Sequence, residues 1–344
     1  MEYYCITAAI PVDEAMFMHD ASMMTSIFMQ VIIFVTLFVF IYILIKRVII
    51  SNLKKINNAL AQITNGDLSV TIDVRSNKEF LLLSDGINST VATLKRFIAE
   101  VTACIDIELE YAKQIQLSAL PNNFPTGEDY NIYAQMIAVK EVGGDFCDFY
   151  KLNNTIVTFL VADVSGKGIP AAMFMMTAKT IIKDLAESGM AVNDIFTKAN
   201  EKLCENNESG MFVTARMEIL NLTTGNIQFA NADHNPPLLK RANGLFECLK
   251  TRADLVLAGM EYVHYRVGES NRLFLYTDGV TEVINIDNKL YGEDRLLIII
   301  NQNASTDATK LLPSLKANID EFVGEALQFE DITMLMLDYN LKKR

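Results

Sequence analysis

A run of residues without one charged side chain, at positions 21–45, constrains this chain more than any other feature of its sequence. About 20 apolar residues suffice to cross a bilayer as a helix, and the run is too long for the apolar centre of a signal peptide. Acidic residues precede it, whereas Lys46 and Arg47 follow it, and basic residues favour the cytoplasmic side. We therefore expect an extracytoplasmic segment at 1–20, a single transmembrane helix at 21–45 in the inner or plasma membrane, and a cytoplasmic remainder. A buried core helix is the alternative.

Composition narrows the class of protein. The net charge of −12 argues against nucleic acid as a partner, because DNA and RNA are polyanions. The five cysteines are scattered without a Cys-x-x-Cys pair, and four of them fall on the predicted cytoplasmic side, where thiols stay reduced. Neither a nucleic-acid binding protein nor a disulfide scaffold is expected.

Apolar residues recur at heptad spacing in two stretches after the predicted span. These residues are Ile49, Leu53, Ile56, Leu60 and Ile63, then Leu83, Ile87, Val91, Leu94 and Ile98. Short heptad helices cannot bury their seams alone, so they predict a partner chain. Residues 46–98 resemble a HAMP linker, the parallel four-helix coiled coil below the membrane spans of bacterial sensors, with Gly66, Asp67, Leu68 and Glu79 as its marks. The resemblance implies a homodimer, and an ordinary helical hairpin is the alternative.

The helical pattern continues through residues 99–121 and ends at Pro121. Turn-forming residues follow at 122–127, which indicates a boundary. We expect a helical linker at 99–121 and a separate domain at 122–344.

The pattern changes to short β runs beyond residue 128. The predicted strands are 131–139, 155–163, 212–222, 226–232, 272–279 and 331–339. Helical spacing after Pro170 predicts two helices, with a break near Gly189 and an end near Cys204. Strands, then helices, then strands joined as hairpins favour an α+β class, a sandwich of mostly antiparallel sheet rather than a doubly wound one.

Acidic residues stand at four predicted strand ends. They are Asp145, Asp163, Asp278 and the pair Glu330 and Asp331. A single acid there is an ordinary turn residue, but four converging carboxylates repel one another and require cations. Oxygen ligands without a His or Cys cluster favour two Mn²⁺ or Mg²⁺ ions over zinc. Two such ions lower the pKa of a bridging water and clamp a phosphoryl oxygen, which predicts hydrolysis of a phosphate ester without a covalent intermediate.

The loop Gly166, Lys167 and Gly168 invites comparison with a nucleotide-binding P-loop. The spacing excludes it, because Val161 stands where that motif needs its first glycine and Gly168 where it needs Ser or Thr. Asp163 is better interpreted as a metal-bridging carboxylate, with the glycines allowing the backbone to approach the ions.

Six motifs in order carry a family resemblance. They are EVGGDFCDFY, VADVSGKGIPAAMFM, GMFVTA, FANADHNPPLL, LFLYTDGVTE and EDITMLML. From 108 to 339 the chain resembles the metal-dependent serine phosphatases typified by stage II sporulation protein E, a bacterial branch of the type 2C superfamily. The resemblance implies a β-sandwich flanked by helix pairs and a binuclear Mn²⁺ or Mg²⁺ site.

The resemblance also implies roles for single residues. Asp145 and Asp163 would bind one ion, with the Val164 carbonyl alongside. Asp163, Asp278 and the acid of the last motif would hold the other ion. Asp145, Asp163 and Asp278 are therefore the expected catalytic residues.

Two positions depart from the family pattern. The last motif often begins with paired Asp, and here its first acid is Glu330. Asp331, directly before Ile-Thr, is the favoured ligand, and Glu330 is the weaker candidate. Asp233 stands where the family usually has glycine, so its Cβ is expected to alter that turn.

Other reactive side chains are expected to be structural. His234 before two prolines is interpreted as a backbone brace rather than a general acid. Cys147 has no His partner in the pattern, and Met173, Met175 and Met176 are interpreted as core packing.

The predicted function is a membrane-anchored protein serine/threonine phosphatase regulated through its HAMP linker. The resemblance implies a phosphorylated STAS-domain protein, an anti-sigma-factor antagonist, as substrate. A catalytically degenerate receptor or scaffold of the same fold is the alternative, and a small-molecule phosphatase is a third possibility.

Overall fold

A computed structural model provides the coordinates of the chain. It describes residues 12–121, 124, 127, 129–205, 207–242, 244–249, 263–267 and 271–340. Most of the predicted amino-terminal segment and of the turn at 122–127 lies outside the described residues. The chain forms two compact units, Met1–Cys104 and Ile105–Arg344.

The first unit begins with consecutive helical segments. They are α1 (Val12–Ile45), the π-helical turn η1 (Lys46–Ile50) and α2 (Ser51–Thr64). In the described part of the chain, one helical run, Ser22–Thr64, is long and apolar enough to cross a membrane. The apolar side chains of residues 27–45 are exposed, as a lipid-facing helix requires. The predicted span at 21–45 thus falls within a helix of sufficient length.

The rest of this unit pairs α2 with the start of α3 (Lys78–Ala119) through a non-helical connector. Ile56 and Ala59 of α2 and Ile72 and Val74 of the connector form a small buried cluster. The Asn88 side chain accepts from the Ile72 N–H at 2.9 Å and donates to the Ile72 carbonyl at 2.8 Å, which fixes the connector on α3. Most of the predicted heptad positions remain exposed, among them Leu53, Leu60, Leu83 and Leu94.

The second unit contains two five-stranded sheets in its described residues, and every neighbouring pair of strands is antiparallel. The first sheet has the order β1 (Tyr130–Ile137), β10 (Ile332–Tyr339), β9 (Asn271–Tyr276), β6 (Leu238–Lys240) and β7 (Phe246–Cys248). The second has the order β2 (Phe146–Lys151), β3 (Ile156–Val164), β4 (Val213–Asn221), β5 (Asn226–Ala232) and β8 (Val263–Arg266). The predicted α+β sandwich of antiparallel sheet is confirmed.

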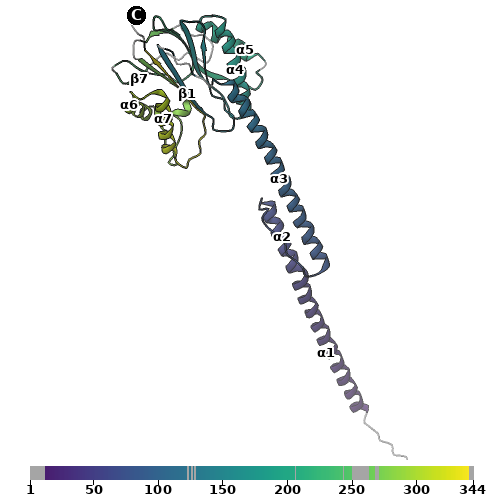
Figure 1. Cartoon of the computed structure of the whole chain (residues 1–344). Helices are drawn as coiled ribbons and strands as arrows, with labels where there is room; N and C mark the ends of the chain where they lie inside the picture. Colours follow the sequence, from purple (N-terminus) through teal and green to yellow (C-terminus); the bar gives the residue numbers. More distant parts are fainter. Residues whose placement is uncertain are drawn as a thin grey trace, which may run out of the picture. The chain divides into compact units, whose positions relative to one another are not determined.

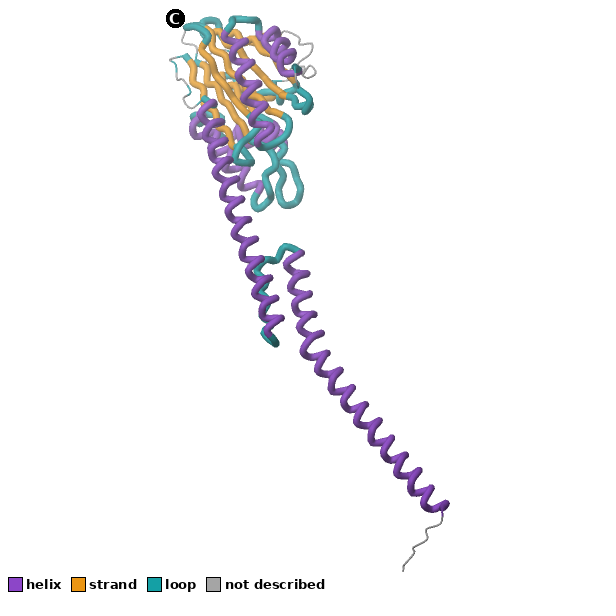
Figure 2. The backbone as a smooth tube through the Cα atoms, turned by 90° about the vertical axis from the view of Figure 1, so that its right-hand side faces the viewer, coloured by secondary structure: helices purple, strands orange, loops and turns teal. Residues whose placement is uncertain are grey.

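The sheets pack face to face, with helices outside them (Figures 1 and 2). Helices α4 (Ile169–Glu187) and α5 (Val192–Cys204) cover the second sheet, and α6 (Gly292–Gln302) and α7 (Ala308–Val323) cover the first. Strand β3 shows why its sequence is apolar throughout. Alternate side chains such as Phe159 enter the core between the sheets, and their neighbours such as Leu160 pack beneath α4 and α5.

The helix pair matches the prediction, with one correction. Helix α4 has Pro170 in its first turn, ends before Gly189, and is followed by α5, which ends at Cys204. Met175 is fully buried, but Met173 is 68% exposed, so the expectation that Met173 is a core residue was wrong. Met173 lies on the opposite face of α4 from the buried Met175.

The sequence pattern also missed elements that bear on the acids. Asp145 directly precedes β2, a strand that was not predicted. The strand expected at 272–279 ends at Tyr276, and Asp278 opens the 3₁₀ turn η2 (Asp278–Val280). Strands β6, β7 and β8 and helices α6 and α7 were not predicted either.

Candidate active site

Asp145 occupies a buried position directly before β2. Its side chain is almost inaccessible, and the Thr277 hydroxyl donates to its Oδ2 at 2.6 Å. The Thr277 hydroxyl also accepts from the Thr333 N–H at 3.0 Å, so β9 and β10 together orient this carboxylate. Burial, and then the charges of Asp163 and Asp331, raise the pKa of Asp145 well above its ordinary value.

Asp163 lies at the centre of the acidic group. It is the penultimate residue of β3, and burial, followed by the charge of Asp278, raises its pKa to about 7. The charges of Glu330 and Asp331 act in the same direction, while a hydrogen bond from Asp145 offsets part of the rise. The acids that sequence reasoning placed on separate strands therefore come close enough to repel one another.

Asp278 joins the group through a close approach of two backbones. Burial, and then Glu282 and Glu330, raise the pKa of Asp278. A Cβ atom at Gly279 would overlap the carbonyl oxygen of Asp331, so only glycine permits the turn to pass this close to the start of β10.

The two acids of the last motif have different partners. The Asp331 carboxylate accepts from the Val139 N–H at 2.8 Å and from the Gly144 N–H at 2.7 Å, so it ties the loop before β2 to β10. Glu330 accepts instead from the ammonium group of Lys167 at 2.7 Å, and both side chains are partly exposed. The carboxylate of Asp331 is thus occupied by fixed backbone donors, whereas that of Glu330 is held by a flexible side chain.

The Val164 carbonyl also borders the site. A Cβ atom at Gly144 would lie 2.8 Å from this oxygen, so glycine allows the backbone before Asp145 to approach β3. Among the described residues, no three Asp, Glu, His or Cys side chains are gathered closely enough to hold an ion as they stand.

These residues fit a divalent cation. The donors are all oxygen atoms, which suits Mn²⁺ or Mg²⁺. Burial and then neighbouring carboxylates raise the pKa values of Asp145, Asp163 and Asp278, and a bound cation would stabilise their charged forms.

Two side chains that were expected not to react, those of His234 and Cys147, are both buried. His234 is buried, and burial lowers its pKa to about 3, so its ring is neutral. Its backbone exchanges hydrogen bonds with the Asn231 side chain, and its Nδ1 lies 3.0 Å from the Thr214 hydroxyl. Burial, and then the charge of Asp148, raise the pKa of Cys147 to about 12, which makes its thiol a poor nucleophile.

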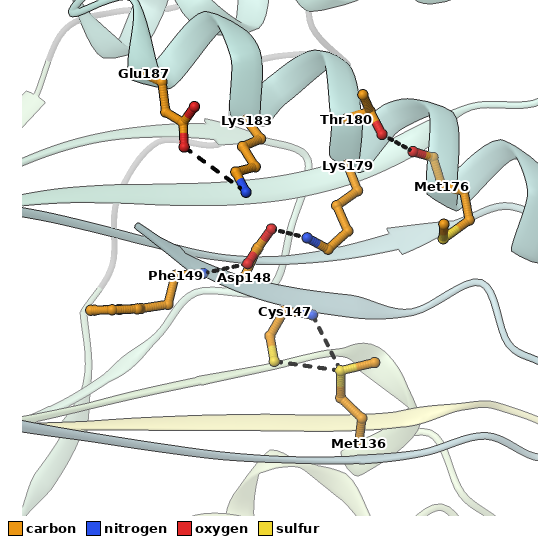
Figure 3. A network of polar contacts seen from close by, with 9 residues as sticks. All are labelled: Met136, Cys147, Asp148, Phe149, Met176, Lys179, Thr180, Lys183 and Glu187. Atoms are coloured by element: carbon orange, nitrogen blue, oxygen red, sulfur yellow. Dashed lines mark hydrogen bonds and ion pairs between the residues drawn. The ribbon is translucent and has the colours of Figure 1, made fainter. Parts of the chain in front are cut away.

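Sequence reasoning missed the buried ion pair between Asp148 and Lys179 (Figure 3). Asp148 points from β2 toward α4 and receives the Lys179 ammonium group, while Cys147 points to the other side, where its Sγ contacts the Met136 sulfur at 3.4 Å. The alternation of side chains along β2 places the acid against the helix. Asp148 therefore fixes α4 on the sheet.

A comparison with solved structures identifies the class of fold. The PP2C domain of SiaA from Pseudomonas aeruginosa matches with a TM-score of 0.62 and 20% identity, covering 70% of this chain and 100% of that chain. The sandwich of two antiparallel sheets with outer helices is therefore the PP2C phosphatase fold.

Sequence comparisons give the family. The family model of stage II sporulation protein E (SpoIIE) matches residues 154–340, and the HAMP domain model matches residues 44–96. The first match covers more than half of the chain, which therefore belongs to the SpoIIE family and carries a HAMP domain before the SpoIIE region.

Two curated relatives are similar over much of the chain. Protein IcfG of Synechocystis sp. is 25% identical over 327 residues, which are 85% of this chain and 51% of IcfG. The phosphoserine phosphatase RsbU of Bacillus subtilis is 24% identical over 238 residues, which are 68% of this chain and 70% of RsbU. The chain thus spans about half the length of IcfG.

Proposed function

We propose that this protein is a membrane-anchored phosphatase that hydrolyses phosphoserine or phosphothreonine on a regulatory protein, with two Mn²⁺ or Mg²⁺ ions in the acidic group. The observation that carries the proposal is the position of Asp163 among other carboxylates, which raise its pKa together with burial. Membership of the SpoIIE family, a family of metal-dependent phosphatases, supports the same chemistry.

The proposed ligands follow the contacts of each side chain. Asp145, Asp163 and the Val164 carbonyl would hold one ion, and Asp163 and Asp278 would contribute to the other. For the remaining ligand of the second ion, Glu330 is better suited than Asp331, because its lysine partner is easier to displace than two backbone amides. When bound, such ions lower the pKa of a water molecule and stabilise negative charge on a phosphoryl group.

The protein's own residues supply orientation. Thr277 fixes the carboxylate of Asp145, and Asp331 fixes the loop that leads to it. Lys167 lies partly exposed beside Glu330, where its positive charge can meet an incoming phosphoryl group.

The arrangement of the whole chain follows from the predicted segments. Residues 1–20 would be extracytoplasmic, and residues 21–45 would anchor the protein in the membrane. Residues 46–98 would form the HAMP linker of a homodimer and relay a signal through the helical linker at 99–121. Residues 122–344 would form the catalytic domain in the cytoplasm. The proposed substrate is a phosphorylated STAS-domain protein of the anti-sigma-factor antagonist type. The name of RsbU as a phosphoserine phosphatase supports the substrate class.

The test uses the full chain in detergent micelles and a phosphoserine peptide. Asp163→Asn and Asp278→Asn should each lower Mn²⁺-dependent phosphate release by more than about a hundredfold, because each removes an ion ligand. Asp184→Asn, at an exposed acid on α4, is the matched control and should keep wild-type activity. Full turnover in both site variants would refute the site, and a wild-type protein that binds no Mn²⁺ in calorimetry would favour the receptor alternative.

A further inference from the structure

The end of α3 is tied to the loop that carries Asp145. The side chain of Gln116, in the last turn of α3, donates from Nε2 to the Gly143 carbonyl at 2.6 Å and accepts the Gly143 N–H on Oε1 at 3.1 Å. Gln116 is 8% exposed although its neighbours on both sides are exposed or half-buried. One side-chain amide therefore satisfies the backbone N–H and the backbone carbonyl of a single residue, much as a neighbouring strand would.

Gly143 lies inside the part of the chain that forms the site. Val139 and Gly144 donate their N–H groups to Asp331, and Asp145 comes two residues after Gly143. The loop is thus fastened to β10 by the Asp331 carboxylate and to α3 by the Gln116 amide. These two attachments hold the backbone on which Asp145 is presented.

Packing between the end of α3 and this loop is incomplete. A cavity of about 250 Å³ lies beside this contact, lined by Gln116, Leu117 and Leu120 at the end of the helix and by Asp145 and Asp331 in the site. Where packing is incomplete, the hydrogen bonds between Gln116 and Gly143 contribute more to the position of the loop.

We propose that Gln116 is a positioning residue through which the end of α3 sets the place of Asp145 among the other acids. Because α3 is one helix from Lys78 to Ala119, a rotation about its axis moves Gln116 and, through Gly143, the loop. The inference rests on the proposed function for its effect on ion binding, but the attachment of the loop can be measured without any ion.

The first experiment measures hydrogen exchange of the segment 138–147 in the metal-free full chain in micelles. Gln116→Leu keeps the helix and most of the side-chain volume but removes both hydrogen bonds, and should speed exchange of the loop about tenfold. Gln116→Glu keeps an acceptor for the Gly143 N–H but sets a carboxylate against the Gly143 carbonyl, and should give a similar or larger effect. Gln114→Leu is the matched control, since Gln114 is exposed on the same helix and bonds to Glu110.

The second experiment measures the affinity for Mn²⁺ by calorimetry. The Gln116 variants should bind Mn²⁺ about ten to a hundredfold more weakly, as is typical when a group that orients a ligand is removed. Their melting temperatures are measured alongside, and Gln116→Glu replaces Gln116→Leu if the latter does not fold.

Three outcomes decide the proposal. Wild-type exchange together with wild-type Mn²⁺ affinity in the Gln116 variants would overturn it, and so would an equal effect of Gln114→Leu. A wild-type protein that binds no Mn²⁺ would overturn the proposed function, while the exchange data would still decide whether Gln116 positions the loop.

Discussion

The two units of the molecule place their apolar side chains in opposite environments. In Met1–Cys104 the apolar residues at 27–45 of α1 and most of the heptad positions are exposed, and the buried cluster around Ile56 is small. In Ile105–Arg344 three clusters enclose side chains such as Phe159 and Phe274 completely. The second unit carries its own core, whereas the exposed apolar residues of the first are what the proposed membrane anchor and homodimer would cover.

The two units also differ in the burial of their ion pairs. The ion pair of Arg75 and Asp73 in the first unit is exposed. The second unit encloses the pair of Lys179 and Asp148, and it buries Arg216 beside Glu218. Buried charges are costly unless they are paired, so the second unit is the more sensitive of the two to the loss of one charged group.

The largest expected effect comes from breaking the buried pair. Lys179→Met should lower the free energy of unfolding by about 3 to 5 kcal/mol, because it leaves the Asp148 carboxylate buried without a cation. Arg75→Met, at the exposed pair, should cause no measurable change. Urea unfolding of the full chain in micelles, followed by tyrosine fluorescence, measures both.

A double variant sharpens this test. Asp148→Leu combined with Lys179→Met replaces both charges by apolar groups and should recover most of the lost stability. If Lys179→Met lowered the free energy of unfolding no more than Arg75→Met, the buried pair would not be what holds α4 on the sheet.

The next largest effect is a dependence of the free energy of unfolding on pH, which arises from His234 in the second unit. Burial lowers the pKa of His234 to about 3, whereas an unfolded histidine titrates near 6.5. Below pH 6.5 the unfolded chain takes up a proton that the folded protein does not, so stability contributed by His234 is lost as pH falls toward 3. The slope is about 1.4 kcal/mol per pH unit at its steepest.

His234→Asn should remove this part of the pH dependence. His19→Asn, at an exposed position of α1, should leave the profile of the wild type unchanged. Thermal melting between pH 7 and pH 5 provides the measurement, and parallel profiles for wild type and His234→Asn would contradict the prediction.

A smaller effect is expected from the exposed seam of the first unit. Leu94→Glu places a charge where a second chain should pack, and should weaken self-association about tenfold or more. Thr93→Glu introduces the same charge at the neighbouring exposed position and is the control. Sedimentation equilibrium in micelles measures both, and equal dimerisation of the two variants would remove the seam as an interface.

The smallest effect concerns a turn in the second unit. Asp233 has a φ of 48°, a left-handed conformation that L-residues adopt at a cost. Asp233→Gly should raise the free energy of unfolding by up to about 1 kcal/mol, because glycine adopts this conformation without strain. Asp287→Gly, at an exposed position without positive φ, should not stabilise, and a loss of stability in Asp233→Gly would show that the Asp233 side chain contributes more than its strain costs.

The sequence predicted the features whose causes are local. The apolar run of β3 predicts a strand that is buried on both faces, and the glycine and proline before α4 predict where that helix begins. Each of these signals lies within a few consecutive residues. The pattern of strands and helices was therefore sufficient for the antiparallel sandwich, and the motifs located the acids.

Features that depend on distant partners were missed. Strand β2 was missed because it has Asp148 in its interior, and an acidic residue is typical of a turn. Its partner Lys179, which makes a buried acid possible there, is distant in the sequence. Glu330 and Asp331 are adjacent in sequence, yet one pairs with Lys167 and the other with amides almost two hundred residues earlier. Periodicity carries no information on such pairings, so the preference for Asp331 over Glu330 as an ion ligand was made without these contacts.

The close passage at Gly279 has a consequence for genetics. A methyl group there would meet a main-chain oxygen, which no rotamer change can move aside. Alleles that exchange this residue should therefore inactivate the protein as thoroughly as alleles that remove an aspartate, although glycine has no functional group to lose. A random screen for null phenotypes should therefore recover substitutions of Gly279 alongside substitutions of the aspartates.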